Sequence, residues 1–214
     1  HRVDRRQRQM CIRDSLLAQL IMHSLKKTTL ATKIPSEDQW MFPINFTETY
    51  LTAYKQQYMV LIDDLFQDKQ PLGERSSALD IITWVSNIPH YTKQAAVPEK
   101  GLPFDSKIII SSSNDFEMNR TEITDNNAIK RRMNMCAHFV EDPNCPIDPL
   151  LKDRIRIDLY KISKEIDPIS KLVNFRKSKV TTCTSEELVS LCVRSFMQWH
   201  ESQEELITSP NTPN

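Results

Sequence analysis

The chain has 214 residues, of which 28 are basic and 28 acidic, so its formal net charge is zero. Hydrophobic residues make up 39% of it, which is typical of a globular protein with one sizeable core. The balance of charge excludes a bulk electrostatic grip on nucleic acid, so any such contact must be local. The five cysteines include no C-x-x-C pair, which favours free thiols over a zinc site or a disulfide framework.

The first third of the chain contains one predicted helix and one predicted strand. Residues 1–14 are arginine-rich and have no apolar periodicity, which predicts a disordered, non-native extension. Apolar residues recur at helical spacing over 16–27. Prolines interrupt 28–57, which predicts loops and short elements there. The continuous apolar run at 58–62 is typical of a strand that is buried on both faces.

Strands and helices alternate along the rest of the chain. The predicted helices cover 76–88, 125–132 and 184–206, and the predicted strands cover 107–110, 135–140 and 154–162. This alternation predicts an α/β fold with a mostly parallel central sheet flanked by helices.

Two acids follow the strand predicted at 58–62. Asp63 and Asp64 lie at the carboxyl end of that strand, which is where an open α/β sheet binds its ligand. One carboxylate there suits Mg²⁺ held through water, and the second suits a water that attacks a γ-phosphate. Aspartates are also common in the turns that end strands, so the pair alone does not distinguish a ligand site from a turn.

Three more polar residues occupy comparable positions. Asn114 ends the second apolar strand, where its amide can bond both a γ-phosphate oxygen and the attacking water. Arg131 and Arg132 lie on a short predicted helix and suit a guanidinium finger offered to the nucleotide of a neighbouring subunit. The ordinary alternative for Asn114 is a residue in a turn. For the two arginines it is the solvated basic end of a helix.

Three segments surround these residues in a fixed order: YKQQYMVLIDDLFQD (54–68), AAVPEKGLPFDSKIIISSSN (95–114) and AIKRRM (128–133). Each segment resembles a motif of one helicase family. The first resembles its Walker B region, the second resembles the two motifs that come next, without a gap between them, and the third resembles its arginine-finger motif. That family is the superfamily 3 helicases of picornavirus-like positive-strand RNA viruses. Gln67 matches the glutamine that follows the Walker B acids. The resemblance covers roughly residues 15–140.

The resemblance implies an AAA+-like P-loop NTPase core that uses ATP and Mg²⁺. It makes Asp63 the metal-associated acid, Asp64 its catalytic neighbour and Asn114 the sensor of the γ-phosphate. It also implies that Arg131 and Arg132 act on the ATP of the adjacent protomer. The working form is then a homo-oligomeric ring, expected to be a hexamer.

The resemblance further implies a partner and a place of action. Lys100 and Gly101 fall where such helicases place a loop that faces the central pore, so they are expected to contact single-stranded RNA. The host cytoplasm, including membrane-bound replication sites, is the implied location. No apolar run approaches the ~20 residues that cross a bilayer, so host-membrane attachment is expected through segments outside this chain.

The phosphate loop of that family, G-x-x-x-x-G-K-[ST], has no match here, because the chain has only two glycines. LLAQLI (16–21) looks like the helix that follows the loop, and Ser15 would be the final serine of a lost Gly-Lys-Ser. We therefore expect an N-terminally truncated core. These 214 residues alone are expected neither to bind ATP tightly nor to hydrolyse it.

The expected organisation places a partial helicase core at 15–145, after the extension at 1–14. A C-terminal part of the domain follows at 146–206, and a polar tail at 207–214.

Three functions are consistent with the sequence. The first is an ATP-dependent RNA helicase used in viral genome replication, with the fragment itself inactive. The second is a catalytically inactive AAA+-like assembly or RNA-binding module, which the missing phosphate loop favours. The third is a cellular or bacterial AAA+ ATPase. Two features disfavour it: the acids are Asp-Asp, and the strand that ends in Asn114 follows them at a distance close to the superfamily 3 layout.

Overall fold

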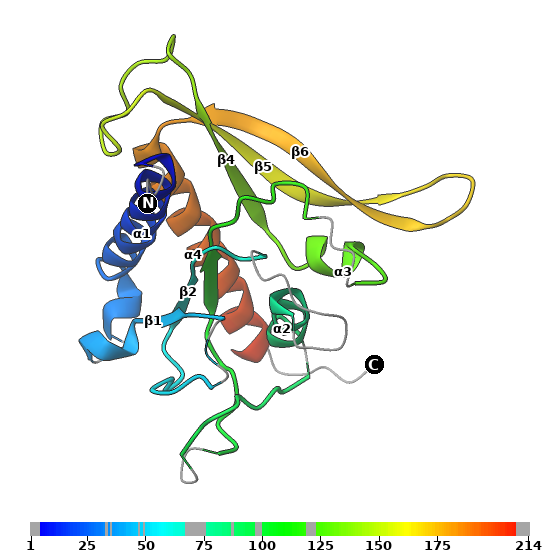
Figure 1. The fold of residues 1–214 in the computed structure, drawn as a ribbon. Helices are drawn as coiled ribbons and strands as arrows, with labels where there is room; N and C mark the ends of the chain where they lie inside the picture. Colours follow the sequence, from blue (N-terminus) through cyan, green and yellow to red (C-terminus); the bar gives the residue numbers. More distant parts are fainter. Residues whose placement is uncertain are drawn as a thin grey trace.

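The computed structural model contains helices and two three-stranded sheets within the residues that it describes (Figure 1). It describes residues 5–208 except 33, 35, 47, 49, 67–75, 87, 97–99 and 119–122, and only the backbone of 5–14, 37 and 206–208. The helices are α1 (Arg5–Leu25), α2 (Ser77–Trp84), α3 (Asn127–Lys130) and α4 (Ser185–Thr208). The strands are β1 (Met41–Ile44), β2 (Met59–Ile62), β3 (Ile108–Ser111), β4 (Met135–Glu141), β5 (Ile155–Ile166) and β6 (Val173–Cys183). Short 3-10 turns lie at Thr29–Thr32 and Glu37–Gln39.

The first sheet is parallel and has the order β1-β2-β3. Its two predicted strands, at 58–62 and 107–110, are confirmed as β2 and β3. The sequence did not predict β1, because Pro43 was taken as an interruption. Pro43 pairs with Leu61 in the register, and β1 lies at the edge of the sheet, where the missing N–H of proline is tolerated.

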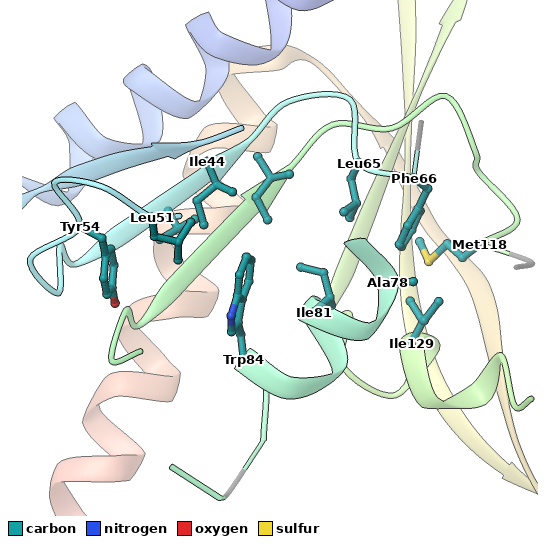
Figure 2. Close-up of a cluster of buried hydrophobic side chains, with 12 residues drawn as sticks. Ile44, Leu51, Tyr54, Leu65, Phe66, Ala78, Ile81, Trp84, Met118 and Ile129 are labelled. Carbon is teal, nitrogen blue, oxygen red and sulfur yellow. The ribbon is translucent and has the colours of Figure 1, made fainter. Parts of the chain in front are cut away.

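Helices cover both faces of the parallel sheet. Val60 and Ile62 of β2 pack with Ile81 and Trp84 of α2, and Figure 2 shows α2 beneath this cluster. On β3, Ile108 belongs instead to a second core cluster, to which α1 and α4 contribute. Successive side chains of a strand point to opposite faces, so one short sheet serves two cores in a three-layer arrangement.

The second sheet is antiparallel and has the order β4-β5-β6, which corrects the expectation of one mostly parallel sheet. The strands predicted at 135–140 and 154–162 exist, but they pair with each other instead of joining β3. Sequence pattern cannot settle such partners, because strand pairing is set by contacts between distant residues. No strand was predicted over β6, since most of its side chains are exposed and its apolar alternation is weak.

The first helix is longer than predicted. It begins at Arg5, so the backbone of 5–14 is helical where a disordered extension was expected. No glycine or proline lies between Arg5 and Leu25, so nothing in the sequence interrupts the helix on its N-terminal side. From Leu17 onward its apolar side is buried against α4 and the antiparallel sheet.

The other predicted helix starts are confirmed. The Ser76 hydroxyl accepts a hydrogen bond from the Leu79 N–H at 3.3 Å and caps α2. Before α4, the Thr184 N–H donates to Glu187 Oε2 at 2.8 Å, and the Glu187 N–H donates to Thr184 Oγ1 at 3.3 Å. This is a reciprocal capping box, and it fixes the point where β6 gives way to α4.

Asp148 joins a turn before β5 to the start of α4. Its carboxylate is 4% exposed and accepts the N–H groups of Leu150 and Leu151, each at 3.0 Å. It also accepts the Ser185 N–H at 2.8 Å and the Ser185 hydroxyl. Burial by itself would raise the pKa of Asp148, but the bonds from Leu151, Ser185 and Leu150 outweigh it and hold the pKa below its ordinary value.

Replacing Asp148 by Asn is expected to lower the free energy of unfolding by about 1–3 kcal/mol at neutral pH, because one amide oxygen cannot accept four donors. The pKa is depressed in the folded state, so this stabilisation is complete above the unfolded pKa of about 4. It disappears as the pH falls through the folded value. Urea unfolding at several pH values measures the difference, with the exposed Glu201→Gln as the control. A difference that grows below pH ~4 would contradict the assignment.

Candidate functional site at the carboxyl end of the parallel sheet

The ends of β2 and β3 are joined by a serine that the sequence did not single out. Ser112 follows β3, and its hydroxyl donates to Asp63 Oδ1 at 2.8 Å. The same oxygen of Ser112 accepts the Asp64 N–H at 3.1 Å. Its backbone carbonyl accepts the Leu65 N–H at 2.8 Å, and its own N–H donates to the carbonyl of Ile62 at 3.0 Å. The turn that carries the two acids is therefore held against the end of β3.

Asp64 has an unusual backbone and an unusual carboxyl group. Its φ of 51° lies in the left-handed region, which a residue with a side chain seldom adopts. Burial, followed by the charge of the neighbouring Asp63, raises the pKa of the Asp64 carboxyl. Both carboxyl groups remain open to solvent. A raised pKa and a left-handed backbone at the end of a buried strand make Asp64 a candidate functional residue.

The structure places Asn114 at the same end of the sheet as the two acids. The Ser113 hydroxyl donates to the carbonyl of Leu65 at 2.7 Å and accepts the Asp115 N–H at 3.0 Å. These bonds fix the backbone on both sides of Asn114, whose side chain is exposed.

The two predicted arginines have different surroundings. Arg132 donates from Nε to the carbonyl of Val85 at 2.7 Å and from Nη1 to that of Ala128 at 2.6 Å. Burial, and then the charge of Arg131, lower the pKa of Arg132. Its guanidinium therefore ties the end of α2 to α3. Arg131 follows α3 directly and has an exposed side chain, so it is the better candidate for contact with another subunit.

Lys100 and Gly101 precede β3, in the 90–104 loop, of which 90–96 and 100–104 are described. The Thr92 N–H donates to the carbonyl of Leu102, and the Phe104 N–H to that of His90, each at 2.8 Å. Lys100 is exposed. Gly101 has a φ of +89°, which favours glycine at this turn.

Two further predicted positions are Ser15 and Gln67. Ser15 lies within α1 instead of at the start of a helix, so its backbone is not presented as that of a phosphate-loop serine would be. Gln67 lies outside the described residues.

The two acids fit Mg²⁺ but the chain offers no cradle for phosphates. Oδ1 of Asp63 is occupied by Ser112, which leaves Oδ2 for a water-mediated cation. The pKa of Asp64 is raised by burial first and then by repulsion from Asp63, and a nearby cation would relieve the repulsion. The backbone N–H groups of a glycine-rich loop are what normally hold the phosphates of ATP, and the sequence contains no such loop.

Among the described residues, no three His, Cys, Asp or Glu side chains converge as a metal site would require. Cys136, Cys145, Cys183 and Cys192 are free thiols. None of the described helices is both long and apolar enough to cross a membrane.

A match to a known family covers the two acids and Asn114 of this site. The family described as RNA helicase matches residues 14–115. The matched segment runs from α1 through Asp115, so it contains Asp63, Asp64 and Asn114 and ends before Arg131. The family agrees with the resemblance that the motifs carry. Residues 14–115 of this chain match the RNA helicase family, the domain family of superfamily 3 viral helicases.

Proposed function

We propose that the chain is part of an ATP-driven viral RNA helicase that acts in genome replication and hydrolyses ATP at the subunit interfaces of a ring. The observation that carries the proposal is the junction of β2 and β3. There Ser112 holds Asp63 in place beside the segment that presents Asn114. The helicase family of residues 14–115 supports the same conclusion.

Each group in this junction suits one part of the reaction. Asp63, with one oxygen fixed by Ser112, would hold Mg²⁺ through water, and the ion when bound would neutralise phosphate charge. Asp64, whose pKa is raised, suits acceptance of a proton from the attacking water. The amide of Asn114 suits orientation of that water. The phosphates of ATP would be bound by a phosphate loop, which these residues do not form.

The exposed cations suit the proposed ring and its proposed RNA track. The exposed Arg131 suits a neighbouring active site, where a guanidinium stabilises the charge of the transferred phosphoryl group. A hexamer, in which Arg131 of each subunit serves the next, is the proposed assembly. Lys100 and Gly101 of the 90–104 loop would contact the backbone of single-stranded RNA without reading bases. The proposed setting is the host cytoplasm, at membrane-bound replication sites.

A second candidate is a catalytically inactive assembly or RNA-binding module with the same fold. It is favoured by one specific observation: Ser15, the one residue that would match the end of a phosphate loop, lies inside a helix.

The coding sequence upstream of Ser15, read from an independent template, tests the proposal. We expect a strand followed by a glycine-rich loop that ends in Gly-Lys-Ser at position 15. The extended protein should then hydrolyse ATP in the presence of single-stranded RNA. Asp64→Asn should lower the turnover by about a hundredfold or more, because the proton acceptor is lost.

The controls separate the two candidates. The 214-residue chain itself should be inactive, and the exposed Glu201→Gln should leave turnover unchanged. If the arginine-rich stretch continues upstream without a phosphate loop, the inactive module is the better account.

A further inference from the structure

The hairpin made by β5 and β6 extends beyond the rest of the molecule (Figure 1). Its turn is tightly bonded. The carboxylate of Asp167 accepts the N–H groups of Ile169 at 2.9 Å and Ser170 at 2.6 Å. The Asp167 N–H donates to the carbonyl of Leu172 at 2.9 Å, and the Lys171 N–H donates to the carbonyl of Asp167 at 3.0 Å. The end of the hairpin is therefore a defined structure that holds its side chains in fixed directions.

Four aliphatic side chains are exposed at this end, and we call them the aliphatic tip. Their exposed fractions range from 41% to 92%, with Ile169 the highest. The members are Ile166, Ile169, Leu172 and Val173. Ile166 and Val173 are direct cross-strand partners, so their side chains share one face of the hairpin. Exposed aliphatic groups gathered in this way indicate a contact surface.

Basic side chains accompany the aliphatic tip. Besides Lys179, which pairs with Asp158, the exposed cations of the hairpin are Lys161, Lys164, Lys171 and Arg176. Of its three acids, Asp158 is buried, Asp167 is engaged by the turn, and Glu165 lies 4.0 Å from Arg176. The whole chain is neutral, so this excess of positive charge is local to the hairpin.

The base of the hairpin is anchored to the body of the protein. Nζ of Lys177 donates to the carbonyl of Phe116 and lies 3.6 Å from the centroid of its ring. Nζ of Lys179 lies 2.7 Å from Oδ1 of the buried Asp158. These two lysines therefore tie β6 to the body of the protein.

We propose that the aliphatic tip enters the headgroup layer of an anionic lipid bilayer, with the exposed cations of the hairpin bound to lipid phosphates and carboxylates. Shallow insertion of aliphatic groups combined with basic residues is the usual chemistry of peripheral attachment to anionic membranes. A single-stranded RNA is disfavoured as the occupant, because the tip has no aromatic ring on which bases would stack. The positive charge favours an anionic surface over a neutral protein surface.

Flotation of the 214-residue chain with vesicles tests the proposal. We expect binding to vesicles of phosphatidylcholine mixed with phosphatidylserine, and much weaker binding to phosphatidylcholine alone. The double variant Ile169→Ser, Leu172→Ser should bind the anionic vesicles about tenfold or more weakly, because most of the inserted apolar surface is gone. The double variant Lys161→Gln, Lys164→Gln should also weaken binding, and chiefly to the anionic vesicles.

The matched control is Ile88→Ser, which removes another exposed isoleucine outside the hairpin and should leave binding unchanged. Circular dichroism checks that each variant is folded. Equal binding by the wild type and the folded Ile169, Leu172 variant would overturn the proposal, as would no binding by the wild type. Concentration-dependent self-association that the same variant abolishes, without vesicle binding, would make the tip an interface between copies instead. RNA binding that depended on the tip would also overturn it. None of these outcomes bears on ATP hydrolysis.

Discussion

Arg131→Ala is expected to lower ATP turnover by roughly a thousandfold in a helicase extended to include the phosphate loop. The side chain is exposed just after α3, so its partner is expected to be a nucleotide on the next subunit. Mixing this variant with Asp64→Asn should restore part of the activity. In mixed rings some interfaces combine an intact Asp64 from one variant with an intact Arg131 from the other.

Arg132→Ala is the matched comparison, since it removes the adjacent guanidinium. It should lower the free energy of unfolding by about 1–3 kcal/mol, because the carbonyls of Val85 and Ala128 lose their donor. Arg131→Ala should leave stability nearly unchanged. ATPase assays of the mixtures and urea unfolding of the single variants measure both effects. Mixtures no more active than either variant alone would show that Arg131 does not act across an interface.

Trp84→Ala is expected to lower the free energy of unfolding by about 3–5 kcal/mol. Trp84 is 7% exposed, and its ring is stacked between Phe104 at 4.9 Å and Phe46 at 5.9 Å. Phe104 in turn stacks on Tyr54 at 5.4 Å. Removal of the indole would open a cavity in the middle of this stack and free Phe104, where the 90–104 loop ends.

Two other substitutions set the scale for Trp84→Ala. Trp84→Phe should cost clearly less, because it retains an aromatic ring and removes an indole N–H that is buried with no hydrogen-bond partner. Trp199→Ala should cost about 1 kcal/mol or less, because that ring is 41% exposed on α4. Chemical denaturation measures all three. Equal losses at Trp84 and Trp199 would mean that the stack does not stabilise the core.

The parts of the site that could be predicted are those that depend on local sequence. The apolar runs of β2 and β3 identify buried strands, and parallel strands bring Asp63 and Asn114 to one end of the sheet. Ser112 was within the predicted motif, but a serine after a strand has no distinctive pattern. Its role emerges only from the distance between its hydroxyl and Asp63.

Other features depend on contacts that no local pattern encodes. The antiparallel pairing of β4 with β5 joins residues that are distant in the sequence, and β6 is too polar to be recognised as a strand. Arg131 and Arg132 are chemically identical neighbours. They are distinguished only because the end of α2 lies within reach of Arg132.

The order β1-β2-β3 has a practical consequence for work with the isolated chain. Within the described strands, β3 has a neighbour on one side only, so the other edge of an isoleucine-rich strand carries unpaired N–H and C=O groups. Three successive isoleucines without charge or proline make such an edge a template for intermolecular β-structure. Slow aggregation during storage, more than thermal unfolding, is therefore expected to limit the concentration at which the protein can be handled.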